Sequence, residues 1–234
     1  MSSRTRLLFE SVLIGLVGAL TVFGLLSALH AELGYLTAFD LSFQTEVHGW
    51  AQPLLTRIML GFTFIGSIRI FIPTFILAVV VFLLIGEREG GIRRIRKRKT
   101  TALFTLGIGG AIVLNETLKI YFHRARPNVP WAIGDEHTFS FPSGHSLFSC
   151  VLYGMIAYLL LARHTPLFPR ALSAALAVAM PLAIGLSRIY LGMHFPTDVL
   201  AGYITGICWL VITILIDRRW QAHSVRTRTV RAIV

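Results

Sequence analysis

Charged residues are scarce in this 234-residue chain, at 14% of the sequence. A soluble domain usually carries about a quarter charged residues, so the scarcity excludes a large water-exposed surface. Hydrophobic residues make up 55% instead, and several apolar runs reach the roughly 18 residues that are typical of a membrane-spanning helix. We therefore expect residues 1–234 to form a single membrane domain, with no room for a second soluble domain.

Cysteine and acidic residues are also few. The two cysteines, Cys150 and Cys208, both lie inside apolar runs and lack the paired spacing of a disulfide framework or a metal motif. The 11 acidic residues leave a net charge of +11, a balance that is common in nucleic-acid-binding proteins. Here the basic residues cluster in short connections between apolar runs, where membrane topology accounts for them. We expect no nucleic-acid partner.

Six apolar runs predict six membrane-spanning helices. They fall at residues 11–29, 68–86, 101–122, 145–162, 171–188 and 199–216. The runs are continuous rather than alternating, which favours helices over the strands of a membrane barrel. The first run is longer than the roughly 7–15-residue core of a cleaved signal peptide, so we interpret it as a retained span. The expected fold class is an all-α, integral membrane bundle of six transmembrane helices.

The lysines and arginines indicate the orientation of this bundle. They concentrate before the first span, at residues 87–99, between spans four and five, and in the C-terminal tail. In a six-span protein these segments lie on one side, which the positive-inside bias places in the cytoplasm. We expect a multi-pass protein of the cell (inner, cytoplasmic) membrane with cytoplasmic N- and C-termini. Residues 30–67, 123–144 and 189–198 then lie on the extracytoplasmic side.

Between spans one and two, residues 53–65 carry apolar side chains at helical spacing. We interpret them as an extracytoplasmic interfacial helix, with Trp50 as an interfacial anchor. Two functions stay open for this helix: a wall along which lipids reach a site, or simple packing at the interface. The sequence does not otherwise indicate the role of residues 40–67.

The informative polar residues gather in three clusters at the expected extracytoplasmic helix ends. The clusters are residues 119–127, 142–145 and 187–198. Lys119, Arg126 and Arg188 are cations on the side that the positive-inside bias disfavours. Guanidinium groups bind phosphate oxygens in a forked geometry, and lysine supplies a compact charge. Together these three side chains favour an anion site over isolated snorkelling.

Ser143 and Gly144 stand at the expected start of the fourth span. A helix N-terminus offers unpaired N–H groups and the positive end of the helix dipole, which together can hold a phosphate oxygen. Gly144 has no side chain to block close approach to the backbone. Pro-Ser-Gly alone is an ordinary turn, but His145 follows it directly.

His194 and Asp198 are four residues apart, and Pro196 between them suits the first turn of the sixth span. Asp198 can accept a hydrogen bond from one ring nitrogen of His194, which would leave the other nitrogen available for attack. The alternative is a helix-terminal charge beside an interface histidine. A metal site is disfavoured, because no carboxylate or cysteine set accompanies the two histidines and three cations would repel a metal ion.

The three clusters resemble the pattern of the type 2 phosphatidic acid phosphatase family, a membrane group with vanadium haloperoxidases and bacterial acid phosphatases among its soluble relatives. That pattern is a lysine, six residues and Arg-Pro; then Pro-Ser-Gly-His; then Ser-Arg, five residues, a histidine, three residues and an aspartate. The clusters match it at every fixed position and span about a third of the chain. The six-span layout extends the resemblance to nearly all of it.

The resemblance implies a phosphatase without metal or cofactor, with a lipid phosphate or diphosphate ester as substrate and membrane lipids as surroundings. His194 would be the nucleophile that forms a phosphohistidine, Asp198 would orient it, and His145 would be the general acid. The phosphoryl oxygens would be held by Lys119, Arg126, Ser143, Gly144 and Arg188. The preferred substrates are undecaprenyl diphosphate and phosphatidylglycerophosphate, with phosphatidic acid and lipid A phosphates as alternatives.

Alternative interpretations stay open for several polar residues and for the class of function. Glu116, one turn before Lys119, is either its ion-pair partner or a structural polar contact, which we favour. His123, Arg124 and residues 135–137 either shape headgroup choice or are solvated, and we favour the latter. A lipid or anion transporter, or a lipid-binding protein without catalysis, is the alternative from another class; we find no inverted repeat of the kind many transporters have. The sequence does not indicate the oligomeric state.

Overall fold

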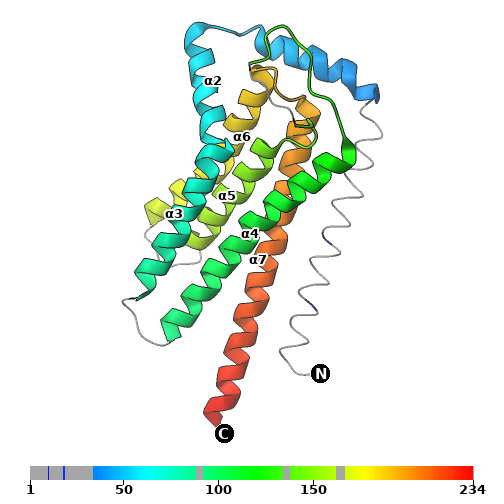
Figure 1. The fold of residues 1–234 in the computed structure, drawn as a ribbon. Coiled ribbons are helices and arrows are strands. Elements are labelled where there is room, and N and C mark those ends of the chain that lie inside the picture. Colours follow the sequence, from blue (N-terminus) through cyan, green and yellow to red (C-terminus); the bar gives the residue numbers. More distant parts are fainter. Residues whose placement is uncertain are drawn as a thin grey trace.

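The computed structural model describes residues 10, 18, 34–87, 92–133, 138–161 and 167–233. Within them every regular element is a helix (Figure 1). A helical segment at 34–48 is followed by α2 (Pro53–Ile65), α3 (Ile68–Glu87), α4 (Ile92–Phe122), α5 (Gly144–Leu161), α6 (Leu167–Tyr190) and α7 (Pro196–Ile233). The all-α prediction is confirmed for this part of the chain.

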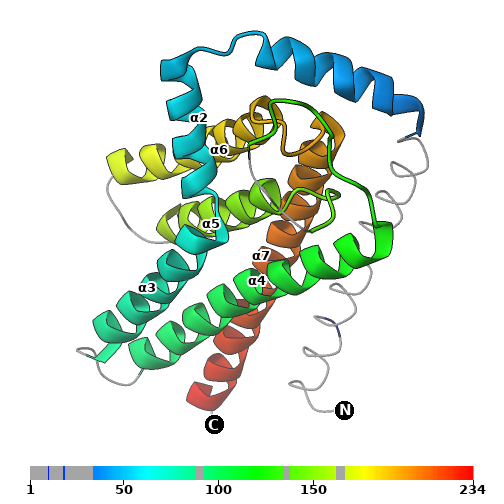
Figure 2. The ribbon, with the colours of Figure 1, turned by 45° about the horizontal axis from the view of Figure 1, so that its top comes forward.

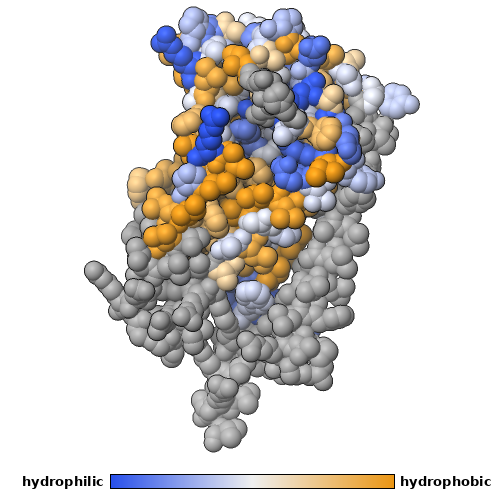
Figure 3. All heavy atoms as spheres, in the orientation of Figure 1, coloured by the Kyte–Doolittle hydropathy of each residue, from blue (hydrophilic) through white to orange (hydrophobic). Residues whose placement is uncertain are grey.

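Four of the described helices are long and apolar enough to cross a membrane, or five if α2 and the start of α3 form one bent span. The four are Ala102–Phe122, Gly144–Leu161, Arg170–Tyr190 and Pro196–Gln221. Large apolar side chains such as Leu77, Val113 and Val178 are exposed. Figure 3 shows apolar residues over the middle of one face, below a more hydrophilic upper end. Such a surface suits lipid rather than water.

The predicted spans from 68–86 to 199–216 coincide with α3 to α7, in order. The helices differ from the prediction in length, because α4 and α7 extend to 31 and 38 residues. The additional turns are rich in lysine and arginine, which form helices well without any need for burial. The predicted first span at 11–29 lies outside the described residues, apart from Gly18.

Helices α4 to α7 run alternately up and down the bundle, so their connections alternate between its two ends (Figures 1 and 2). Helix α5 lies at the centre and contacts α4, α6 and α7. In the part of α5 that is long enough to cross a membrane, 61% is buried, compared with 39–44% in the corresponding parts of the other three helices. The end of α4, the start of α5, the end of α6 and the start of α7 therefore meet at one end of the bundle, where all three sequence clusters lie.

Residues 53–65 form the predicted helix, and Pro53 stands in its first turn, where a missing N–H is harmless. Helix α2 is followed by α3 after a bend of 48°, and it packs against α6. Figure 2 shows α2 and α3 as one bent column beside the bundle, whereas the segment 34–48 crosses over the end of the bundle.

Two glycines permit close approach between helices near the clusters. A Cβ at Gly202 of α7 would lie 2.5 Å from the backbone oxygen of Ser143, and a Cβ at Gly185 of α6 would lie 1.9 Å from the hydroxyl of Tyr203. The N–H of Ser143 also donates to the carbonyl of Asp198 at 3.0 Å. The start of α5 is therefore held directly against the start of α7, which fixes two of the three clusters relative to each other.

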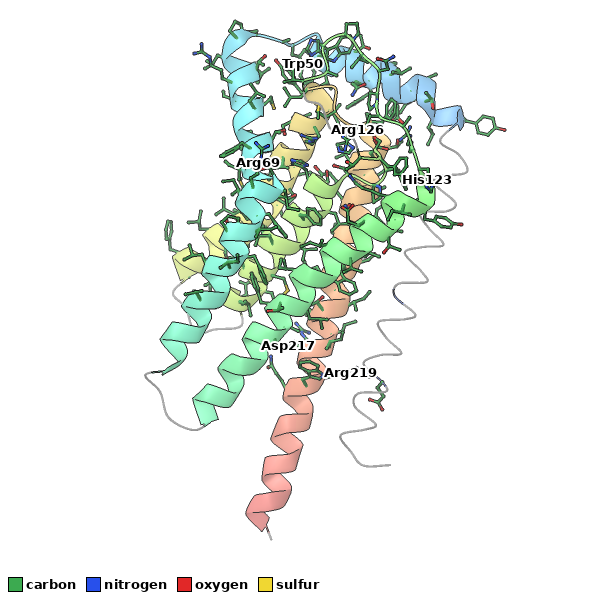
Figure 4. All side chains as sticks on the ribbon, viewed as in Figure 1. Trp50, Arg69, His123, Arg126, Asp217 and Arg219 are labelled. Carbon is green, nitrogen blue, oxygen red and sulfur yellow. The ribbon has the colours of Figure 1, made fainter. Side chains whose placement is uncertain are left out.

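A separate polar contact ties α5 to α7 at the other end. Asp217 accepts hydrogen bonds from Tyr158 Oη at 2.8 Å and from Gln221 Nε2 at 2.6 Å. Figure 4 shows Asp217 far down the bundle and Arg126 near its upper end. The polar residues at the upper end of the bundle are therefore separate from the contact around Asp217.

Candidate active site

A cavity of about 690 Å³ opens where the four helix ends meet. Its walls come from α2, the α2–α3 bend, the start of α3, α4, α5, α6, the loop after α4 and the turn before α7. Five of the eight predicted site residues line it, namely Lys119, Gly144, His145, Arg188 and His194. Arg126 and Asp198 are not among the lining residues, but both contact His194, and Ser143 directly precedes Gly144. The two histidines, distant in sequence, therefore border one cavity.

The contacts of His194 define its tautomer. The residue is buried, and its Nε2 lies 3.2 Å from Nη1 of Arg126. Because a guanidinium only donates hydrogen bonds, Nε2 must be the acceptor. The ring proton is then on Nδ1, which faces Oδ2 of Asp198 at 3.5 Å and Oγ of Ser140 at 3.4 Å. Nε2 therefore carries the lone pair that a nucleophile requires.

Asp198 is fully buried, and both of its oxygens accept hydrogen bonds. Oδ2 accepts from the hydroxyl of Ser140 and from the N–H of Phe195, the latter at 2.9 Å. Oδ1 accepts from Nη1 of Arg124. A buried carboxylate needs such donors, because an unpaired charge is costly to remove from water. These contacts hold Oδ2 beside the ring of His194.

Thr138 accepts hydrogen bonds from two of the predicted cationic side chains. Its Oγ1 accepts from Nζ of Lys119 at 3.2 Å and from Nη2 of Arg126 at 3.0 Å. Nε of Arg126 donates to the Thr138 carbonyl at 2.8 Å, and Nη1 donates to the Met193 carbonyl at 2.9 Å. The forked guanidinium is thus oriented beside Nε2 of His194. A phosphate oxygen bound here would meet two positive charges and the lone pair together.

The start of α5 reaches the cavity through Gly144 rather than Ser143. The Ser143 N–H is engaged by the Asp198 carbonyl, and its hydroxyl accepts from Ser146 Oγ at 3.2 Å. A Cβ at Gly144 would lie 3.2 Å from Nδ2 of Asn115, so a side chain there would crowd the wall. The N-terminal backbone of α5 can therefore come close to an anion at Gly144.

Arg188 and His145 border the cavity from α6 and α5. Arg188 is 1% exposed, and its carbonyl accepts from the N–H groups of Met193 at 3.0 Å and His194 at 3.3 Å. Its backbone therefore shapes the turn that carries His194. His145 lies under the α2–α3 bend, where a Cβ at Gly66 would be 3.3 Å from its Cδ2.

The structure overturns our interpretation of Arg124 as a solvated loop residue. Its side chain is 10% exposed and forms ion pairs with Asp198 and, at 2.8 Å, with Asp40. Asp40 is fully buried and belongs to the segment 34–48, whose role the sequence did not indicate. Ser140 was missed as well. The sequence signal that could have revealed Asp40 as a partner of Arg124 was the polar residue at every fourth position of the segment 34–48, beginning with Asp40.

Other predicted polar residues lie nearby with simpler contacts. Glu116 lines the cavity and accepts a hydrogen bond from the amide of Asn115 at 2.8 Å. His123 is exposed, and its ring packs edge-on against Phe139 at 4.6 Å between centroids. Residues 135–137 lie outside the described residues. Within the described ranges, no three His, Cys, Asp or Glu side chains gather as metal ligands would.

Residues 99–222 match the PAP2 superfamily. The chain belongs to this superfamily. It is 35% identical to phosphatidylglycerophosphatase B of Bacillus subtilis over 158 residues, which are 67% of this chain and 72% of that protein. It is 31% identical to an undecaprenyl-diphosphatase of Sulfolobus acidocaldarius over 116 residues, or 47% and 52% of the two chains.

A solved structure agrees with this assignment. The crystal structure of a transmembrane PAP2-type phosphatidylglycerolphosphate phosphatase from Bacillus subtilis matches with a TM-score of 0.73 and 26% identity. The match covers 86% of this chain and 96% of that one. The resemblance inferred from the three motifs is confirmed, and the chain is a membrane lipid phosphatase of the PAP2 superfamily.

Arg126→Lys should lower kcat/KM for a lipid phosphate by about ten- to a hundredfold. Lysine keeps the charge but cannot reproduce the fork that contacts Thr138, Met193 and His194, and a hydrogen bond to a charged group contributes roughly 1.5–3 kcal/mol. Phosphate release by purified protein measures the change. Arg57→Lys, at an exposed position of α2, is the control and should leave the rate unchanged. An unaltered rate in Arg126→Lys would contradict the assigned role.

Proposed function

We propose that this PAP2 phosphatase hydrolyses a lipid phosphate or diphosphate ester through a phosphohistidine on His194, without a metal ion or other cofactor. The observation that carries the proposal is the state of the His194 ring, whose Nε2 is an acceptor while Nδ1 faces Asp198. A neutral imidazole held in this tautomer can attack phosphorus directly.

In the first step, Nε2 of His194 forms a bond to phosphorus as the bond to the leaving oxygen breaks. His145 donates a proton to that oxygen, so the lipid departs as an alcohol, or as a lipid monophosphate when the substrate is a diphosphate. Asp198 stabilises the positive charge that develops on the ring of His194.

In the second step, water attacks the phosphohistidine while His145 takes its proton. The P–N bond breaks, inorganic phosphate leaves, and His194 is restored. Charge on the other phosphoryl oxygens is stabilised by fixed donors throughout. We assign this role to Lys119, Arg126, Arg188 and the backbone at Gly144, because the N–H of Ser143 is already engaged by the carbonyl of Asp198.

The proposed substrates are undecaprenyl diphosphate and phosphatidylglycerophosphate, with phosphatidic acid and lipid A phosphates as alternatives. The names of the relatives support three of these four: the phosphatidylglycerophosphatase, the undecaprenyl-diphosphatase, and a lipid A 1-phosphatase of Rhizobium johnstonii that is 30% identical over 53% of this chain. The cavity suits an amphipathic molecule, because Leu60, Phe64 and Phe148 line it together with Lys119 and Arg188. The position of α2 in this wall favours the lipid-access interpretation over packing alone.

We also propose the six-span topology in the cell membrane, with cytoplasmic termini and an extracytoplasmic site. Residues 11–29 form the first span in this proposal, and α2 lies at the extracytoplasmic interface. The support is charge asymmetry, because α4 begins with a lysine- and arginine-rich stretch at the end of the bundle opposite the cavity (Figure 1).

Single cysteines should report the topology in a chain that carries Cys150→Ala and Cys208→Ala. Asn128→Cys should react with a membrane-impermeant maleimide in intact cells, because this exposed residue lies at the cavity end. Arg170→Cys, exposed near the start of α6, should react only after the membrane is opened. The reverse pattern, or equal labelling of both positions, would show that the orientation is wrong.

Purified protein should release phosphate from at least one of the four proposed lipids in the presence of a chelator. His194→Ala should abolish release, whereas His123→Ala should preserve it, because His123 is exposed and does not line the cavity. An alkaline quench should trap phosphohistidine only when His194 is present. Activity that disappears with chelator would count against the metal-free mechanism. Lipid binding or transport without hydrolysis would instead favour the non-catalytic alternatives.

Arg69 is a further cation on the cavity and lies outside the three motifs. It is exposed at the start of α3 and lines the cavity (Figure 4). Arg69→Gln should lower kcat/KM for a lipid diphosphate about two- to fivefold relative to a lipid monophosphate, because an exposed ion pair contributes roughly 0.2–1 kcal/mol. Phosphatidic acid is the monophosphate for this comparison, because its only phosphate is the one that is hydrolysed, whereas undecaprenyl diphosphate offers a second phosphate to this guanidinium. Arg57→Gln is the matched control. If the ratio of the two kcat/KM values in Arg69→Gln equals that in Arg57→Gln, a contact between Arg69 and the second phosphate is excluded.

A further inference from the structure

We propose that the helical segment 34–48 acts as a clamp that positions His194, with Asp40 and Gln44 as positioning residues. This inference rests on the proposed role of His194 and concerns residues outside the three motifs. The segment crosses over the end of the bundle where the cavity lies (Figure 2). Its polar residues Asp40, Gln44 and His48 are four apart, so they share one face of a helix.

Asp40 fixes the beginning of α7 and Arg124 at the same time. Its Oδ1 accepts from the N–H of Thr197 at 3.1 Å, and its Oδ2 accepts from the Thr197 hydroxyl at 2.6 Å. Oδ2 also pairs with Nη2 of Arg124 at 2.8 Å. Asp40 is fully buried, so every one of these contacts is made away from water, where it is stronger.

Arg124 links Asp40 to the proposed catalytic pair, Asp198 and His194. One of its terminal nitrogens binds Asp40 and the other binds Asp198, while its Cζ lies 4.2 Å from the ring centre of Phe195. Asp198 in turn faces Nδ1 of His194. The guanidinium therefore orients Asp198 and balances its charge, and Asp40 determines where the guanidinium lies.

Gln44 holds the backbone that carries the nucleophile. Its Nε2 donates to the carbonyl of His194 at 3.0 Å and lies 3.5 Å from the carbonyl of Ile189. One turn further on, Nδ1 of His48 donates to the carbonyl of Tyr190 at 3.1 Å, and its ring stacks on Trp131 at 4.6 Å. Both ends of the turn between α6 and α7 are thus bound by one face of the segment.

The other face of the segment provides a control. Glu46 is exposed, so Glu46→Gln removes a carboxylate charge from the same helix without touching the turn. Asp40→Asn keeps the shape of the side chain but removes the charge that holds Arg124. The two substitutions change the net charge equally, but only Asp40→Asn alters the face that contacts Thr197 and Arg124.

Asp40→Asn should lower kcat by about 10- to 100-fold, the range typical of lost partners that orient site residues, and change KM by less than about twofold. The kcat–pH profile should also shift, because the charge environment of the His194–Asp198 pair changes. Gln44→Met, which leaves all charges in place, should lower kcat without that shift. Glu46→Gln should behave like the wild type in every measurement.

A purely structural role would reduce the folded fraction while the kcat per folded molecule and its pH profile stayed as in the wild type. That result, or an Asp40→Asn protein equal to Glu46→Gln, would overturn the clamp.

If the wild type releases no phosphate, the proposed function fails instead. The clamp is then tested by the rate at which diethyl pyrocarbonate modifies His194, mapped by mass spectrometry. The rate should change severalfold in Asp40→Asn, and an unchanged rate would overturn the clamp in this case too.

Discussion

A largely buried guanidinium between two fully buried carboxylates holds the cavity end of this protein together. Arg124 joins Asp40 to Asp198, and so connects a segment before α2, the loop after α4 and the start of α7. Removal of one partner from a buried ion pair typically costs about 3–5 kcal/mol, because the remaining charge is left without compensation. The three parts of the chain are therefore confined to one arrangement, and in that arrangement His194 borders the cavity.

The two arginines of the loop after α4 are held by acceptors of different charge. Arg124 is held between carboxylates and has a structural task. Arg126, two residues later, is oriented by the neutral carbonyl oxygens of Thr138 and Met193 and by the Thr138 hydroxyl. Neutral acceptors direct a guanidinium without cancelling its charge, so its field can act on a bound anion. Two arginines of one loop thus differ in whether their charge is compensated, because only Arg124 has carboxylate acceptors.

The sequence predicted the features that depend on local pattern and not those that depend on distant partners. Five apolar runs located α3 to α7, since the length of an apolar run directly reflects the thickness of a bilayer. The three motifs located the cavity residues, because each motif stands at a helix end and the alternating helices bring those ends together. Arg124 could not be interpreted in this way. Its burial is produced by Asp40, 84 residues earlier in the chain, and an arginine in a polar loop looks solvated until its partner is known. The placement of α2 beside α6 likewise depends on a bend at Gly66 that periodicity does not reveal.

In the mechanism that we propose, the hydrogen bond that Arg126 donates to Nε2 of His194 shields the attacking atom before a substrate binds. A lone pair that is engaged as an acceptor reacts poorly, and it becomes available only when the guanidinium turns to a stronger acceptor. An anionic phosphoryl oxygen is such an acceptor, whereas a neutral carbonyl oxygen is a weaker one. In that mechanism, uncharged electrophiles among the surrounding lipids would meet an unreactive imidazole, because only an anionic phosphoryl group would draw the guanidinium away from Nε2.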